Sequence, residues 1–142
     1  MISINFEDVS VDGLNEKILT VWLSGVCEDE GLVLQEVNLI FCSDSHLLNI
    51  NIESLNHDYY TDIITFDYCV GINVFGDLFI SKDRVEENAL DNKVNFMNEL
   101  YRVIVHGVLH LCGYKDKSEE DSLLMRQKED FYLNKYVSRE TY

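Results

Sequence analysis

One stretch of this chain reads His106-Gly107-Val108-Leu109-His110-Leu111-Cys112-Gly113-Tyr114-Lys115-Asp116. Its two histidines are four residues apart, so on a helix they lie on one face, one turn above the other. Gly113 is a typical helix end, because glycine readily adopts the left-handed conformation found there. The chain can then turn back and bring Asp116 toward the two imidazoles. The stretch therefore predicts a helix whose end carries a metal site.

The candidate metal ligands are His106, His110 and Asp116. Two imidazole nitrogens and a carboxylate oxygen make a site typical of catalytic zinc, which keeps a fourth position open for water. The surrounding residues 103–111 are mostly apolar, and a histidine without a partner would be costly to bury there. We expect one zinc ion (Zn²⁺) per chain, with another divalent ion as the alternative. The pattern indicates a metal-dependent hydrolase.

The same spacing, His-x3-His-x2-Gly-x2-ligand, occurs in a class of zinc peptidases. Those enzymes carry glutamate directly after the first histidine, where it acts as the general base. This chain has Gly107 at that position. The usual peptidase route to an activated water is therefore missing, and a protease is disfavoured.

Length and composition indicate one folded domain, residues 1–142, with 46% apolar residues. No apolar run approaches the ~20 residues needed to span a membrane, and the first residues lack the pattern of a signal peptide. The cysteines are Cys27, Cys42, Cys69 and Cys112, without a Cys-x-x-Cys pair. Scattered cysteines in apolar segments are typical of a reducing compartment. We expect a cytoplasmic protein without a membrane segment.

The formal net charge is −15, whereas nucleic-acid binders normally show a basic surface. The positive residues of the second half, around the histidine motif, are Lys82, Arg84, Lys93, Arg102, Lys115, Lys117 and Arg126. They form either a local basic patch or ordinary solvated surface charges. Charge alone does not favour RNA binding, so a polyanionic substrate would need help from the metal, a partner protein or both.

Hydrophobic periodicity predicts the order strand, helix, strand, helix, two strands and three helices. The expected strands are residues 2–6, 37–42, 61–68 and 74–81, the last two forming a hairpin. The expected helices are residues 12–31, 43–55 and 81–92, one from 95 through the histidine motif, and one from 118 onward. This order predicts an α+β (mixed α/β) fold, in which about five helices cover one small mixed sheet of about four strands. The metal site falls on a helix of the C-terminal half.

Several of these helices carry apolar residues at helical spacing. The residues of the first helix that we expect in the core are Leu14, Ile18, Val21, Trp22 and Val26. The residues that share one face of the histidine-bearing helix are Phe96, Leu100, Val103 and Gly107. The last helix carries Leu123, Leu124, Phe131 and Leu133.

Three blocks of the sequence resemble the bacterial YbeY family of rRNA maturation endoribonucleases. Residues 106–116, followed by Met125 and Glu129, are similar to the family's His-Gly-x-Leu-His-Leu-x-Gly-Tyr-Asp-His signature. Residues 58–66 resemble its Thr-Asp-Val-Leu-Ser-Phe strand, and residues 76–81 resemble its Gly-Asp-Ile-x-Ile-Ser strand. The blocks occur in the order found in the family.

The resemblance implies a cytoplasmic, metal-dependent endoribonuclease that is specific for single strands. Its substrate would be rRNA, at the 3′ end of 16S rRNA in late maturation, and it would act in ribosome quality control. In the family three histidines hold the metal, and their positions match His106, His110 and Asp116. A carboxylate oxygen is also a zinc ligand, so we expect a site of two histidines and one aspartate. The added negative charge would favour harder ions such as manganese.

The resemblance also implies an arginine that contacts phosphate just before the Thr-Asp strand, and Leu55 occupies that position. Leucine offers none of the hydrogen bonds by which arginine grips a phosphate. The candidates for a substitute catalytic cation are Arg102, Lys115 and Lys117, and the general base stays open. The candidates for lining the cleft are Asn51, His57 and Asp58. The carboxylates that could orient the histidines are Asp62, Asp77 and Glu99.

Two other functions stay open at this point. A ribosome-associated assembly or binding factor, with a mainly structural metal and little nuclease activity, would suit the acidic charge, because such a surface favours a basic ribosomal protein. A ribosomal protein or assembly factor is an expected partner in either case, while the oligomeric state stays open. A metal-dependent hydrolase of small molecules would show a deep pocket rather than an open groove.

Overall fold

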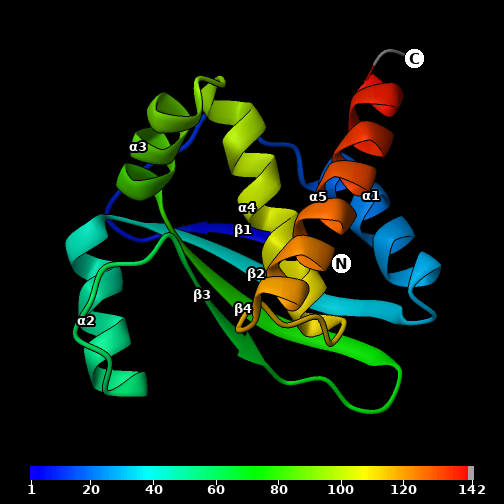
Figure 1. Cartoon of the computed structure of the whole chain (residues 1–142), viewed down its shortest axis with the longest axis horizontal. Coiled ribbons are helices and arrows are strands. Elements are labelled where there is room, and N and C mark those ends of the chain that lie inside the picture. The colour runs from blue at the N-terminus through cyan, green and yellow to red at the C-terminus, as the bar shows by residue number, and fades with distance from the viewer. Residues whose placement is uncertain (141–142) are drawn as a thin grey trace.

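The computed structural model describes residues 1–140, with side chains through residue 136 (Figure 1). The strands are β1 (Ile2–Phe6), β2 (Val33–Cys42), β3 (Ile63–Asp67) and β4 (Asn73–Ser81). The helices are α1 (Glu16–Asp29), α2 (Asp44–Leu55), α3 (Lys82–Asn92), α4 (Phe96–Leu111) and α5 (Glu119–Glu140). The predicted order of elements and the α+β class are confirmed. The last two residues of the expected domain, 141–142, lie outside the described residues.

The four strands form one mixed sheet in the order β1-β2-β4-β3. β2 runs parallel to β1 and β4, whereas β3 and β4 form the predicted antiparallel hairpin. β2 begins at Val33, earlier than the sequence predicted, and Val33 pairs with Asn73. A bulge follows between Leu34 and Glu36. Gln35 also donates a hydrogen bond to the Asn73 side chain at 2.9 Å. The polar residues at this bulge interrupt the hydrophobic pattern that would have marked the longer strand.

The helices cover the two faces of the sheet unequally. The main core joins one face of the sheet to α1, α4 and α5, and Figure 1 shows α4 lying across the strands. A smaller cluster on the other face joins α2 to β3 and β4, through Leu47 and Ile64. β3 is therefore an edge strand that lies between α2 and α4, and this is where the candidate site forms. Within the described residues, none of the helices has the length and apolar character needed to cross a membrane.

The first helix buries a face that differs in part from the expected one. Trp22 and Val26 are buried as predicted, but Ile18 and Val21 are 45% and 58% exposed. The buried residues of α1 are Leu19, Trp22, Leu23, Val26 and Cys27. They follow the i, i+3, i+4, i+7 spacing around Trp22, which leaves Ile18 and Val21 beside the buried stripe rather than on it.

The last helix is attached to the core mainly by residues other than its expected apolar ones, of which Leu133 alone is partly buried against the core. Leu123, Leu124 and Phe131 are exposed, whereas Met125, Glu129, Tyr132 and Tyr136 are the buried residues. The Trp22 indole donates a hydrogen bond of 2.9 Å to the carbonyl of Tyr132. A charged residue such as Glu129 is tolerated in this face because its carboxylate has charged and hydrogen-bonding partners.

The helix that carries the histidines packs closely on the sheet through Gly107. Asn95 caps it as predicted, accepting a hydrogen bond of 2.7 Å from the backbone of Asn98. A Cβ atom on Gly107 would lie 2.7 Å from the Ile63 side chain and 2.9 Å from that of Leu78. Gly107 is therefore a packing position, and a glutamate there, as in the peptidases, would not fit.

Candidate metal centre

The end of α4 brings together the three residues predicted as metal ligands. The Nε2 atoms of His106 and His110 lie 3.0 Å apart, and each lies 3.4 Å from Oδ2 of Asp116. The turn that returns the chain toward the histidines begins at Gly113, whose φ of 103° is in the left-handed region. Its amide donates to the carbonyl of His110 at 3.0 Å. The predicted glycine helix end is thus present and positions the aspartate.

These three side chains fit a divalent metal ion. Ligand atoms at about 2.0–2.2 Å from a tetrahedral zinc stand about 3.3–3.6 Å from one another, close to the distances between the three facing atoms here. Among the described residues, His106, His110 and Asp116 form the group able to hold an ion. The two histidine side chains are partly buried and Asp116 is exposed, so the group is open to solvent on one side.

Both imidazoles are held from behind through their Nδ1 atoms. Nδ1 of His106 donates to the Glu129 carboxylate at 2.7 Å, and Nδ1 of His110 donates to the backbone carbonyl of Tyr114 at 2.9 Å. With the proton on Nδ1, the lone pair of each Nε2 is available toward the other ring and Asp116. Such contacts fix the ring orientation that metal-bound histidines need.

The charges around His106 support an ionised carboxylate behind it. Burial opposes protonation of the His106 ring, but contact with Glu129 outweighs it, and the charges of Asp62 and Asp116 add to the effect, so its pKa is raised. Burial also opposes ionisation of Glu129, but the hydrogen bonds from His106 and Arg102 hold its pKa below the usual range. A basic ring of this kind is a strong metal donor, and a proton competes with a metal for it.

The candidate cations lie at three different places. Arg102 lies behind His106, where it contacts Glu129 at 2.9 Å and Asp130 at 2.7 Å. Lys115 is exposed and lies outside the set of described residues that line the cavity beside the histidines. Lys117 lines that cavity. The structure therefore brings only Lys117 of the three to the cavity wall.

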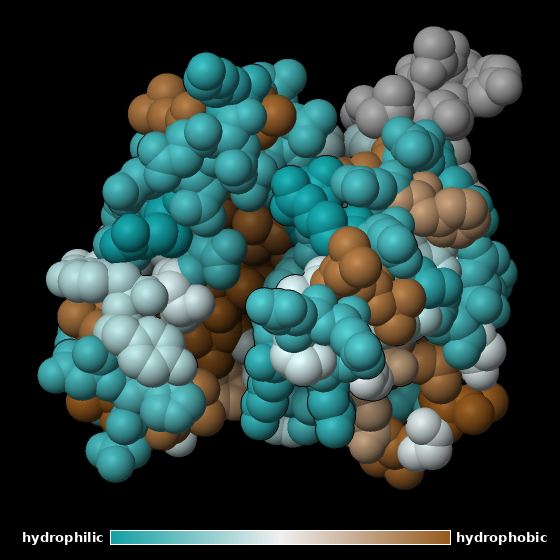
Figure 2. Space-filling model, viewed as in Figure 1, coloured by the Kyte–Doolittle hydropathy of each residue, from teal (hydrophilic) through white to brown (hydrophobic). Residues whose placement is uncertain are grey.

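A cavity of about 600 Å³ opens beside the three candidate ligands, which line it together with Asn51, Leu55 and His57. Figure 2 shows this hollow, with a hydrophobic floor, between the surface of α2 and α3 and the loop that joins α4 to α5. Leu55 stands on the wall, where the resemblance placed an arginine. Asp58 is exposed and is not among the described lining residues. The hollow opens at the surface of the molecule (Figure 2).

The carboxylates considered for orienting the histidines take other positions. Asp62 lines the cavity, and burial raises its pKa. Asp77 accepts a hydrogen bond from Asn38 at 2.9 Å, and Glu99 is buried on α4. The carboxylate that contacts a histidine from behind is Glu129, whose role we did not predict. Its place in the sequence after the histidine motif was the available signal, since it shares with Met125 the i, i+4 spacing of the buried face of α5.

Comparison with known proteins gives a consistent family assignment. Residues 2–137 match the family model described as Endoribonuclease YbeY. The protein named Endoribonuclease YbeY in Flavobacterium johnsoniae is 54% identical over 131 residues, covering 92% of this chain and 93% of that protein. The protein of the same name in Porphyromonas gingivalis is 47% identical over 132 residues, covering 92% and 87%.

A solved structure shares the fold. The solution structure of TM1509 from Thermotoga maritima matches with a TM-score of 0.68 and 28% sequence identity, covering 99% of this chain and 92% of that one. The match to the family model, the two relatives and the shared fold all cover most of the chain. On this evidence, the chain belongs to the Endoribonuclease YbeY family.

Proposed function

We propose that this protein is a metal-dependent endoribonuclease that hydrolyses single-stranded RNA. The observation that carries the proposal is the convergence of His106, His110 and Asp116 on one point beside an open cavity. Membership of a family whose relatives are named endoribonucleases supports the reaction class. We propose zinc as the resident ion, since two imidazoles and one carboxylate are a common catalytic zinc set.

The residues of the site would have separate roles in the reaction. A bound divalent ion would supply Lewis acidity toward a phosphate oxygen and make a nearby water more acidic. Glu129 and the Tyr114 carbonyl hold the Nδ1 protons of His106 and His110, which keeps both Nε2 atoms available as donors. Lys117 stands on the cavity wall, where its charge would attract a phosphate. It is our candidate for the cation that substitutes for the family arginine.

The family resemblance supports the biological setting that we propose. It supports late rRNA maturation at the 3′ end of 16S rRNA and ribosome quality control, in the cytoplasm. A ribosomal protein or assembly factor is the proposed partner. The net charge of −15 supports such a partner, because an acidic surface attracts basic ribosomal proteins.

A binding factor with little nuclease activity is the second candidate. Leu55 at the position of the family arginine favours it, and so does the charge of the cavity. Among the described residues that line the cavity, Lys117 is the one lysine or arginine, against Asp62, Asp67 and Asp116. A phosphate is held weakly where carboxylates outnumber cations.

A cleavage assay separates the two candidates. A single-stranded RNA is incubated with the wild type, His110→Ala and His46→Ala, all purified identically. His46 lies at the start of α2, outside the described residues that line the cavity, so its variant is the matched control. We expect cleavage by the wild type and His46→Ala, and a loss of about a hundredfold or more in His110→Ala. Equal cleavage by all three would indicate a contaminating nuclease and favour the binding factor.

A further inference from the structure

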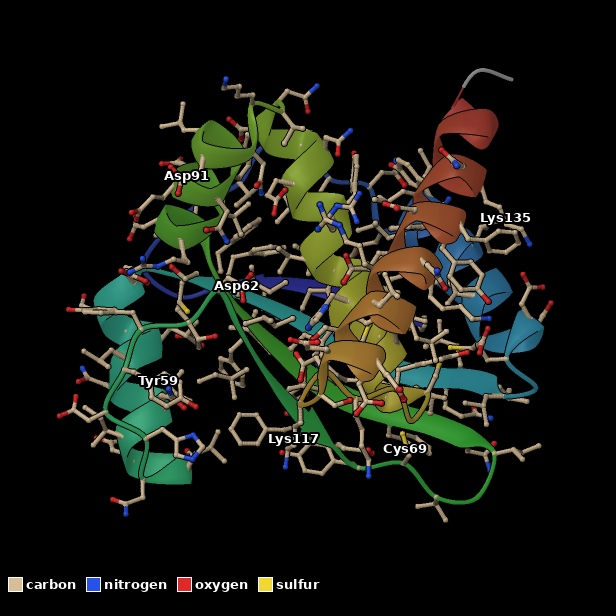
Figure 3. All side chains as sticks on the ribbon, viewed as in Figure 1. Tyr59, Asp62, Cys69, Asp91, Lys117 and Lys135 are labelled. Atoms are coloured by element: carbon tan, nitrogen blue, oxygen red, sulfur yellow. The ribbon has the colours of Figure 1, made fainter. Side chains whose placement is uncertain are left out.

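Two aromatic rings, those of His57 and Tyr59, line the cavity, and Figure 3 shows Tyr59 on the α2 side, across from Lys117. The rings of His57 and Tyr59 are stacked, with centroids 5.2 Å apart and planes 21° from parallel. A hydrogen bond of 2.9 Å joins the Tyr59 hydroxyl to Nδ1 of His57. Tyr59 is nevertheless 55% exposed. Both side chains are exposed and line the cavity, so aromatic surface of this pair is available there.

The loop that carries the two rings is fixed by one buried side chain. Asn51 is 1% exposed, and its amide donates to the backbone carbonyl of Tyr59 at 2.9 Å. The His57 amide in turn donates to the backbone carbonyl of Asn51 at 3.1 Å. The loop is thus tied twice to the last turns of α2. Rings held in place before a ligand arrives lose little conformational entropy when they bind it.

The charges of the cavity favour a neutral, flat group beside these rings. The carboxylates of Asp62, Asp67 and Asp116 line the cavity with Lys117, so a chain of phosphates would be repelled along most of the wall. Leu55 and Ile63 add apolar surface to it. A nucleobase is uncharged, and its flat face stacks on aromatic side chains.

We propose that His57 and Tyr59 form a stacking site for one unpaired nucleobase of the RNA, next to the candidate metal centre. This inference rests on the proposed nuclease function. It adds that the protein binds a nucleobase of the substrate as well as a phosphate. A base in a duplex has both faces covered by its neighbours, so only a single-stranded or unstacked segment can use the site. The site would therefore contribute to the choice of single strands, while the metal and Lys117 contact the phosphate.

A fluorescence measurement tests the site directly. A short single-stranded RNA with 2-aminopurine at alternate positions is titrated with the metal-loaded wild type, Tyr59→Ala, Tyr59→Phe and Tyr60→Ala. Tyr60 is the matched control, because it is as exposed as Tyr59 but faces the Arg84 guanidinium, at 5.3 Å from its ring centroid. We expect quenching by the wild type, Tyr59→Phe and Tyr60→Ala, and a Kd raised about 5- to 150-fold in Tyr59→Ala. Equal quenching and Kd in Tyr59→Ala would overturn the inference.

Cleavage kinetics of the same four proteins separate this inference from the proposed function. If both hold, Tyr59→Ala raises KM for single-stranded RNA with kcat nearly unchanged, since the metal ligands are intact. Cleavage by the wild type with an unchanged KM in Tyr59→Ala would overturn the stacking site and leave the nuclease proposal standing. Quenching that depends on Tyr59, without cleavage by the wild type, would keep the stacking site and overturn the nuclease proposal.

Discussion

Glu129 determines how His106 can act, because its carboxylate bonds to the far side of the ring. The carboxylate is 2.7 Å from Nδ1 of His106 and 2.9 Å from Arg102. Arg102 keeps the carboxylate charged, and the carboxylate keeps the ring basic and oriented. Arg102, which the sequence suggested as a catalytic cation, therefore supports His106 through Glu129 instead of lining the cavity.

Glu129→Gln should weaken metal binding without removing a ligand. The amide keeps the size of the side chain but loses the charge that makes His106 a strong donor, so we expect metal affinity to fall about 10- to 100-fold. Competition with a chelating dye measures this affinity. Asp130→Asn is the control, since Asp130 contacts Arg102 but not the histidine. An equal loss in both variants would mean that the effect passes through Arg102 and not through the ring.

Asp116→His should change which ion the site prefers. The carboxylate is a harder ligand than imidazole and adds a negative charge, so the wild type should accept manganese more readily than the variant does. Competitive titration of zinc against manganese in both proteins gives the ratio of the two affinities. We expect the preference for zinc to rise in Asp116→His. An unchanged ratio of affinities would contradict the proposal that the Asp116 carboxylate shifts the metal preference toward manganese.

Local sequence predicted the convergence of the three candidate ligands better than the contacts that support them. The spacing of His106 and His110 and the turn at Gly113 are fixed by neighbours within one or two helical turns, so the convergence with Asp116 could be expected. The contact of Glu129 with His106 joins residues 23 positions apart and depends on how α5 packs on α4. The spacing of Met125 and Glu129 indicates that they share a helix face, but no local pattern shows which residue of α4 that face contacts.

At the scale of elements, two glycines set how closely the sheet approaches its neighbours. Gly76 on β4 and Gly107 on α4 both lie where a Cβ would be closer than 3.0 Å to other atoms. At Gly107 these are the ends of the Ile63 and Leu78 side chains, which can rotate. At Gly76 they include the backbone carbonyl of Phe66, at 2.9 Å, which is held in the ladder between β3 and β4.

Gly76→Ala should therefore destabilise the fold more than Gly107→Ala. We expect the free energy of unfolding to fall by about 1–3 kcal/mol for Gly76→Ala, because a paired strand cannot shift its carbonyl. At Gly107 the helix propensity of alanine offsets up to about 1 kcal/mol of the cost. Urea denaturation measures both. A neutral Gly76→Ala, or a larger loss at Gly107, would contradict this account of the contact.

Glu30, at the end of α1, is bonded to α5 and to the loop between α4 and α5, and its contribution to stability should depend on pH. Its carboxylate accepts hydrogen bonds from the hydroxyls of Tyr114 and Tyr132 and contacts Lys128 at 3.3 Å. Burial raises its pKa, but these contacts outweigh burial and hold the pKa below the ordinary value of 4.5. A carboxyl group whose pKa is lowered in the folded state stabilises the protein at pH values above its ordinary pKa. This stabilisation is lost as the pH falls through the pKa of the folded state.

Glu30→Gln should thus destabilise the protein at neutral pH and matter less in acid. We expect a loss of about 1–3 kcal/mol near pH 7, from hydrogen bonds to a charged group, and a smaller difference as pH falls below about 4.5. Urea denaturation of wild type and variant over this range measures the difference. A difference that stays constant, or grows on acidification, would show that the charge of Glu30 is not what stabilises the contact.

The order of the elements was predictable because each has a strong local pattern, with caps such as Asn95 and hydrophobic alternation in the strands. The buried faces of the outer helices were less so. Leu123 and Phe131 are exposed while Tyr132 is buried, since Tyr132 reaches both Trp22 and Glu30. Which residues of a helix face the core depends on such partners from distant parts of the chain.

The molecule as a whole carries a strongly negative net charge, although RNA, the substrate of an endoribonuclease, is itself a polyanion. Its net charge of −15 repels the phosphates of RNA at long range. In our proposal, substrate binding comes from short-range contacts in the cavity, namely with the metal, with Lys117 and with the rings of His57 and Tyr59. The account therefore depends above all on whether an ion binds where the three candidate ligands meet.

Anomalous X-ray scattering from a crystal, recorded at the absorption edges of zinc and manganese, tests this most directly. The account predicts one peak within bonding distance, about 2.0–2.2 Å, of Nε2 of His106, Nε2 of His110 and a carboxylate oxygen of Asp116. The same data identify the ion. No peak in a crystal grown with either metal, or a peak away from these three residues, would contradict the proposed metal centre.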